Sequence, residues 1–168
     1  MALGRFIALA ALVLTLVPSA AAQEAEPVVA PPMIDLGPTP EALVSRVIDG
    51  STLDAEINGV RVAVGYLGVD TPPANQPCGQ AALERNRQLV GERVLLMADP
   101  TYDFDLIGRR LYYAFTVDGV SIDEILVREG LGRAVRTEAV EGSVLQEAEA
   151  DAAAAGRGCI WEGMASTG

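Results

Sequence analysis

Three short segments of the chain carry the residues best suited to chemistry. They are Asp49-Gly50-Ser51-Thr52, Asp70-Thr71-Pro72-Pro73 and Gly108-Arg109. Every basic residue of the chain is an arginine, because the sequence contains neither lysine nor histidine. A histidine base, a histidine metal ligand and a lysine nucleophile are therefore excluded. Carboxylates, arginines, hydroxyls and backbone groups remain as possible actors.

The order and spacing of these segments resemble the thermonuclease family of staphylococcal nuclease-like proteins. The family pattern is Ile-Asp-Gly-Asp-Thr, then an arginine five residues before Asp-Thr-Pro-Glu, then Gly-Arg ahead of a strand. The resemblance runs from Ala42 to Glu162 and covers most of the chain. Further matches are Gly79-Gln80-Ala81-Ala82, Val127-Arg128-Glu129-Gly130-Leu131-Gly132 and Ile160-Trp161.

The resemblance implies a calcium-dependent phosphodiesterase, in which carboxylates hold the cation, a glutamate activates water and two arginines neutralise the phosphate. By this likeness Asp70 corresponds to a metal-ligating carboxylate and Thr71 to a ligating backbone carbonyl. Asp49 corresponds to an acid close to the metal. Arg109 corresponds to the second phosphate-binding arginine.

Three positions depart from the family pattern. Ser51 replaces a metal-binding acid, Gly65 replaces the first phosphate-binding arginine and Pro73 replaces the glutamate base. Loss of a general base costs ~10²–10⁴ in rate, and loss of a transition-state arginine ~10³–10⁵. We therefore interpret the chain as a degenerate, non-catalytic binding or structural module, with calcium or no cofactor. The alternative is a calcium-dependent nuclease that cleaves DNA or RNA with a rebuilt active site.

Neighbouring residues offer little compensation for these losses. Asp54 lies on the opposite face of its strand from Ser51. Arg61 shares a face with Gly65 but is roughly 13 Å away along the strand. A carboxylate leaning over from an acidic loop is a further possibility; the loop acids are Asp99, Asp103 and Asp105.

The position of Arg109 distinguishes the two hypotheses. A rebuilt metal site requires Asp49, Asp70 and a third carboxylate within reach of one ion, with Arg109 facing them. An Arg109 that instead pairs with Asp105 or points to solvent argues against the enzyme.

The charge of the chain bears on its partners. Its formal net charge is −11, and a polyanion such as DNA would meet net repulsion, because phosphate neutralisation supplies most non-specific affinity. The partner is unknown, and an envelope or extracellular protein is favoured over nucleic acid; the acidity also serves solubility. Tyrosines offer stacking surfaces or core packing, at Tyr66, Tyr102, Tyr112 and Tyr113.

The N-terminal region predicts export. Residues 1–22 read as a signal peptide, with Arg5, an apolar run and Ala20-Ala21-Ala22 before Gln23. We expect a periplasmic or secreted protein with no transmembrane span after cleavage; the alternative is a membrane anchor formed by an uncleaved N-terminal segment. Residues 23–42 form a Pro/Ala-rich linker, 43–162 the folded domain and 163–168 a tail.

The chain has two cysteines, Cys78 and Cys159. In an oxidising compartment an even count favours one disulfide. It would close a loop of about eighty residues, worth roughly 4 kcal/mol in the chain-entropy model. Two unrelated thiols are the alternative; zinc is disfavoured because no histidine completes a tetrahedral set.

The pattern of apolar residues predicts an α+β fold. Asn58-Gly59 between two alternating runs predicts a hairpin, and Ser121 with Glu124 predicts a helix start. Strands are expected near 44–48, 52–57, 60–67, 93–97 and 111–117, and helices near 80–90, 121–129 and 143–155. This order suggests a small five-stranded Greek-key barrel of the OB type with about three helices, the architecture that the family resemblance also implies.

Overall fold

The computed structural model describes residues 40–135 and 141–161. The predicted signal peptide (1–22), nearly all of the predicted linker and the predicted tail (163–168) lie outside this part of the chain. Among the described residues, no helix has the length and apolar character needed to cross a membrane.

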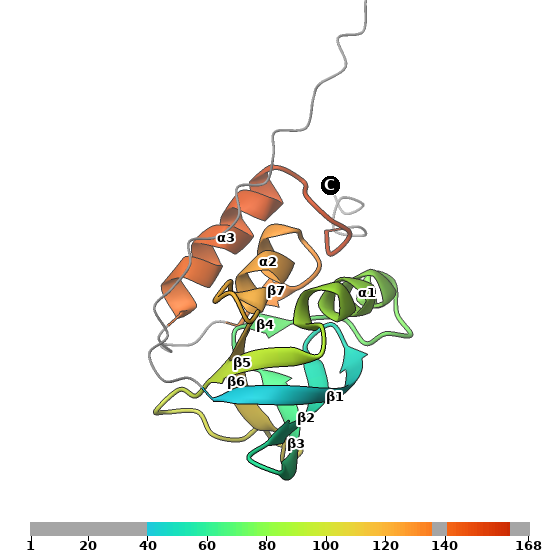
Figure 1. Ribbon diagram of the computed structural model, residues 1–168. Coiled ribbons are helices and arrows are strands. Elements are labelled where there is room, and N and C mark those ends of the chain that lie inside the picture. Colours follow the sequence, from blue (N-terminus) through green and yellow to red (C-terminus); the bar gives the residue numbers. More distant parts are fainter. Residues whose placement is uncertain (1–39, 136–140, 162–168) are drawn as a thin grey trace, which may run out of the picture.

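Five strands close into a barrel (Figure 1). Neighbouring strands are antiparallel except β3 and β6, which run parallel and complete the ring. In spatial order they are β1 (Glu41–Asp49), β2 (Thr52–Ile57), β3 (Val60–Tyr66), β6 (Arg110–Phe115) and β5 (Arg93–Met97). The predicted α+β barrel of the OB type is confirmed.

The β2–β3 hairpin forms where the sequence predicted it. Asn58 (φ 51°) and Gly59 (φ 80°) both have positive φ, as a tight hairpin turn requires. Strand β1 starts earlier than predicted, within the last two residues of the expected linker. The reason is that Ala42 is fully buried and Glu41 pairs with Leu95.

A second, two-stranded sheet was not predicted. Strand β4 (Val69–Asp70) pairs antiparallel with β7 (Arg133–Ala134). Val135 N also donates to Gly68 O at 2.9 Å. This short pairing connects the chain after β3 to the chain after α2, so it places Asp70 beside Arg133.

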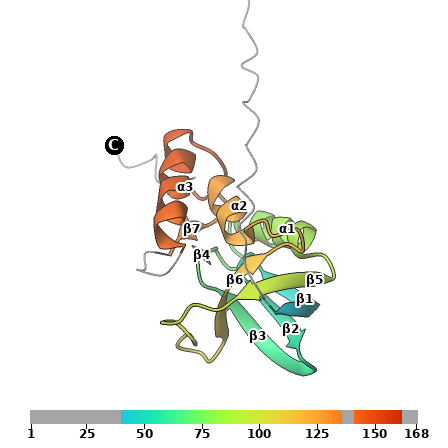
Figure 2. The same cartoon turned by 60° about the vertical axis from the view of Figure 1, so that its left-hand side comes forward.

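Three helices, α1 (Gly79–Val90), α2 (Ile122–Arg128) and α3 (Gly142–Ala154), gather at one end of the barrel (Figure 1). Figure 2 shows α2 and α3 side by side, and residues of the two helices contact each other. Ser121 caps α2 as predicted, since its Oγ accepts from Glu124 N at 3.1 Å.

One hydrophobic core joins the barrel to the helices. Its fully buried side chains include Leu53 and Phe115 from the barrel, Leu126 from α2 and Leu145 from α3. The tyrosines belong to this packing rather than to a stacking surface: Tyr66, Tyr112 and Tyr113 are buried, and Tyr102 is half-buried against the core.

Candidate functional site

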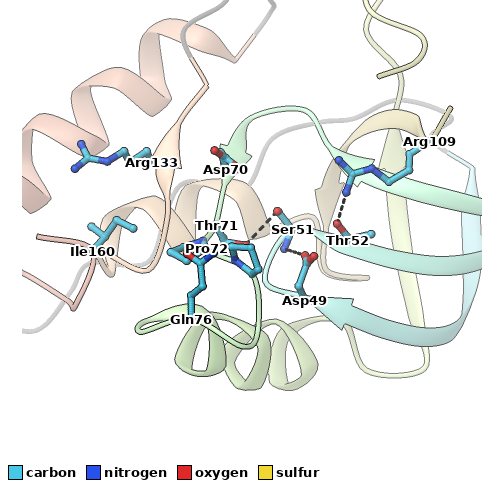
Figure 3. A pocket seen from close by; sticks show the side chains of 11 residues that line it. Asp49, Ser51, Thr52, Asp70, Thr71, Pro72, Gln76, Arg109, Arg133 and Ile160 are labelled. Carbon is cyan, nitrogen blue, oxygen red and sulfur yellow. Dashed lines mark hydrogen bonds between the residues drawn. The ribbon is translucent and has the colours of Figure 1, made fainter. Parts of the chain in front are cut away.

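A pocket of about 430 Å³ opens where the β1–β2 turn, the chain after β4 and the start of β6 meet (Figure 3). It brings together all the residues that the sequence singled out for metal and phosphate chemistry. These are Asp49, Asp70, Thr71 and Arg109, and two of the substituted positions, Ser51 and Pro73, line it as well.

The β1–β2 turn forms one wall. Ser51 N donates to Asp49 Oδ1 at 2.9 Å, and Asn86 Nδ2 of α1 donates to Asp49 O at 2.9 Å. Glycine is needed at position 50, because an added Cβ would lie 2.5 Å from the Ala82 Cβ. The turn is therefore held against α1, and the Asp49 carboxylate is folded back onto the backbone of Ser51.

The hydroxyls of Ser51 and Thr71, which both line the pocket, form a hydrogen bond with each other. Ser51 Oγ lies 3.1 Å from Thr71 Oγ1, within hydrogen-bond distance (Figure 3). Asp70, which precedes Thr71 in the chain, is exposed; its backbone pairs with Arg133 in the β4–β7 sheet, but its carboxylate forms no hydrogen bond or ion pair with another described residue. The pocket thus presents one free carboxylate, Asp70, beside a neutral hydroxyl pair.

Arg109 forms the opposite wall and is already engaged. Its Nε forms an ion pair with Asp105, and its Nη1 donates to Thr52 Oγ1 at 2.6 Å. Asp105 also accepts from Ile107 N at 3.0 Å and Arg109 N at 2.9 Å. Although burial acts to raise it, these hydrogen bonds hold the pKa of Asp105 below its usual range. Arg109 lines the pocket and pairs with Asp105 at the same time.

In the described part of the chain, the pocket has no third carboxylate beside Asp49 and Asp70. Among the described residues, no group of three or more His, Cys, Asp or Glu side chains is placed to hold one metal ion. The acidic-loop side chains have other contacts: Asp99 is buried and accepts from Thr101 N, and Asp103 lies 3.8 Å from Arg110. On β2, Asp54 pairs with Arg46 at 2.8 Å. The possibility that this loop supplies the missing ligand finds no support in the geometry.

The C-terminal segment completes the pocket. Cys78 and Cys159 form a disulfide with their Cα atoms 5.4 Å apart. The bond lies two residues after Gln76 and one before Ile160, which both line the pocket. Ile160 N donates to Gly130 O at 3.0 Å, which fixes the segment further. The disulfide therefore joins two separate parts of the pocket wall.

Sequence reasoning missed the lining residues Gln76, Arg133 and Ile160, and it gave no role to Thr52, although Thr52 belongs to the first of the three segments. Arg133 directs its side chain towards α3 (Figure 3), where the guanidinium lies over Trp161 at 4.9 Å and 3.6 Å from Glu149. The position of Ile160 follows from the cysteine pairing. Nothing in the sequence indicates that Arg133 borders the pocket, because its place depends on the β4–β7 pairing.

The chain is similar to several curated proteins over about half of its length. Endonuclease YncB of Bacillus subtilis is 40% identical over 97 residues, which are 54% of this chain and 46% of the relative. Endonuclease YokF, derived from the SPbeta prophage of the same organism, is 37% identical over 100 residues, or 55% and 33%. Thermonuclease of Staphylococcus intermedius is 37% identical over 99 residues, or 55% and 58%. In each case the match spans less than two thirds of the relative.

The family model described as staphylococcal nuclease homologue matches residues 63–163. The match includes the β3–β4 region with Asp70 and Thr71, the Arg109 segment, all three helices and both cysteines. Together with the five-stranded barrel and the three capping helices, this match establishes that the chain belongs to the staphylococcal nuclease homologue family.

Proposed function

We propose that this protein is an exported, non-catalytic member of its family, in which the former active-site pocket serves as a binding site. The observation that carries the proposal is the state of Arg109, the one phosphate-binding arginine that the sequence retains. Its guanidinium is bound by the Asp105 carboxylate and by Thr52. An incoming phosphate would have to compete with a carboxylate for the same cation, and there is no second arginine at Gly65 to share the charge.

The donor set supports the same conclusion for calcium. The ion takes about six to eight oxygen ligands, several of them charged. The pocket offers the carboxylates of Asp49 and Asp70, and two of its hydroxyls, on Ser51 and Thr71, are hydrogen-bonded to each other. This set fits calcium poorly, so no reaction step is assigned to a metal.

The charge of the chain supports a protein partner. With a net charge of −11, the protein would repel a nucleic acid backbone. In the pocket, the free Asp70 carboxylate and the neutral hydroxyls suit a ligand with amine or amide donors better than a polyanion. We infer that the occupant is a segment of an envelope or extracellular protein.

A calcium-dependent nuclease is the second candidate. It is favoured by the convergence of Asp49, Asp70, Thr71 and Arg109 on one pocket, and by the endonuclease names of the relatives. It would require a ligand and a base from residues outside the family pattern.

Cleavage of single-stranded DNA tests the two candidates. The purified protein is assayed with calcium and with chelator, next to its Arg109→Ala variant. A third sample carries Ser51→Asp, Gly65→Arg and Pro73→Glu together, which restore the family's charged groups. We expect no calcium-dependent cleavage by the unmodified protein and a gain of such cleavage in the triple variant, lost again when Arg109→Ala is added.

Calcium-dependent cleavage by the unmodified protein that disappears in Arg109→Ala would overturn the proposal and establish the nuclease. Far-UV circular dichroism of each variant serves as the folding control. Cleavage that survives Arg109→Ala in the unmodified background indicates a contaminating nuclease, and the preparation is then repurified and assayed again.

A further inference from the structure

A group of buried acids lies away from the pocket, where α2 and α3 meet the barrel. Asp123 is fully buried, Glu124 is 1% exposed and Glu141 is 6% exposed. Ionised carboxylates are rarely buried without partners, because loss of hydration strongly disfavours the charged form. The contacts of these three residues therefore decide how this junction responds to pH.

Asp123 connects three parts of the fold. Its Oδ1 accepts from Gly68 N at 2.8 Å and its Oδ2 from Ala114 N on β6 at 2.9 Å. The site is closely packed, since a Cβ on Gly68 would lie 2.5 Å from Leu145 Cδ1 of α3 and 3.0 Å from Tyr113 Cε1. The Asp123 carboxylate is thus enclosed by α2, α3, β6 and the chain between β3 and β4.

Glu141 borders the same junction at the start of α3. Its backbone N donates to Tyr113 Oη at 3.3 Å. Its side-chain Oε2 is buried and has no hydrogen-bond partner in the described part of the chain. An ionised Glu141 would leave a buried charged oxygen unsatisfied, whereas a protonated one carries no charge to solvate.

Within the part of the chain that the structure describes, the other groups that face this junction do not neutralise it. They are Tyr66 on β3, Tyr113 on β6, Asp99 after β5 and Glu124 on α2. The base nearby, Arg128, is bonded to Glu124 at 2.7 Å. Ionisation of both Asp123 and Glu141 therefore adds negative charge to a buried region in which Arg128 already pairs with Glu124.

The protonation equilibria follow from these surroundings. Burial raises the pKa of Asp123 to about 7, although its backbone hydrogen bonds act in the opposite direction. Burial, and then the nearby Glu124, raises the pKa of Glu141. Because the folded state holds these protons more tightly than the unfolded state, the junction is most stable in acid and loses stability as the pH rises towards neutrality.

We propose that this junction is a pH-responsive latch for α3, closed when Asp123 and Glu141 are protonated and loosened when both ionise. Helix α3 is the element that responds, because Glu141 and Leu145 hold its first turns against the barrel. The same helix carries Glu149, which lies 3.6 Å from the pocket residue Arg133. Release of α3 therefore displaces Glu149 and alters the edge of the pocket at Arg133. The latch is independent of whether the pocket binds a protein or cleaves nucleic acid.

Hydrogen exchange on the full chain tests the latch. Exchange of α3 amides is measured relative to β2 amides, which lie outside the junction, at about pH 5.5 and pH 8.5, each corrected for its intrinsic rate. We expect the relative protection of α3 to fall about tenfold or more at the higher pH, since one pKa unit corresponds to a factor of ten. Trp161, the single tryptophan of the chain, gives a parallel fluorescence readout.

The variants separate the latch from a general effect of pH. Glu141→Gln mimics the protonated acid and should hold the relative protection of α3 within about twofold across the same range. Glu147→Gln, an exposed position on the same helix, should behave like the unmodified protein. Asp123→Asn should resemble Glu141→Gln, and if it fails to fold, Glu141→Gln alone decides. An unchanged α3 protection in the unmodified protein, or an undiminished fall in Glu141→Gln, would overturn the latch.

Discussion

The guanidinium of Arg109 occupies the space above Gly65. A Cβ built on Gly65 would lie 3.4 Å from Arg109 Nε and 3.5 Å from Cζ, and 3.2 Å from Leu111 Cδ2. Gly65 is also the cross-strand partner of Thr52, which accepts the hydrogen bond from Arg109. The missing side chain at position 65 and the position of Arg109 are therefore two parts of one arrangement.

This arrangement predicts that substitutions at the two positions are not additive. Gly65→Val should destabilise the protein by about 1–3 kcal/mol, because it forces Arg109 and Leu111 to move. In an Arg109→Ala background the same change should cost clearly less, since part of the space is then empty. Urea denaturation of the two single variants and the double variant measures the coupling. Equal costs of Gly65→Val in both backgrounds would contradict this account.

A side chain at Gly79 should disturb the wall of the pocket. A Cβ at this position would lie 1.9 Å from the Pro73 carbonyl oxygen and 2.6 Å from that of Pro72. Gly79→Ala should therefore displace the chain that lines the pocket and cost about 2 kcal/mol or more. Ala81→Gly, an exposed change in the same helix, is the matched control and should cost about 1 kcal/mol. Thermal melting compares the two variants, and similar costs would argue against the clash.

The disulfide predicts a large effect of reduction on stability. Cys78 and Cys159 are 81 residues apart in sequence, and the chain-entropy model gives roughly 4 kcal/mol for a loop of this length. A reducing agent should lower the urea midpoint of the unmodified protein accordingly. It should leave the midpoint of the Cys78→Ser, Cys159→Ser variant unchanged. Unchanged stability on reduction would show that the bond adds little to the native fold.

The raised pKa of Asp123 sets the direction in which the free energy of unfolding should change with pH. Its pKa rises from 3.8 to about 7 on folding, mainly through burial. The raised pKa adds to the free energy of unfolding. This stabilisation is fully present below about pH 4 and is lost as the pH rises past 7, a decrease on the order of 4 kcal/mol. Urea unfolding measured between about pH 4 and pH 7 should show this decrease in the free energy of unfolding. In Asp123→Asn, the free energy of unfolding should change less with pH. A stability that increases over this range would contradict the prediction.

The sequence predicted the barrel well, because its strands alternate and the Asn58-Gly59 turn has a specific backbone requirement. It did not predict the β4–β7 sheet, since two residues per strand are too few to show a periodicity. Asp105 lies four residues before Arg109, a spacing that allows the two side chains to pair. The choice between Asp105 and the pocket, and the bond to Thr52, depend on barrel geometry that only the folded chain defines.

The closed strand order has a consequence for how copies of this protein meet. In an open sheet, the outermost strands present unpaired backbone groups that recruit strands from other molecules. Here β1 pairs with both β2 and β5, and the β3–β6 pairing completes the ring, so the barrel has no outermost strand. The extra sheet of the described chain has only two residues per strand. Edge-to-edge association, the usual first step of β-aggregation, thus has no template on the barrel.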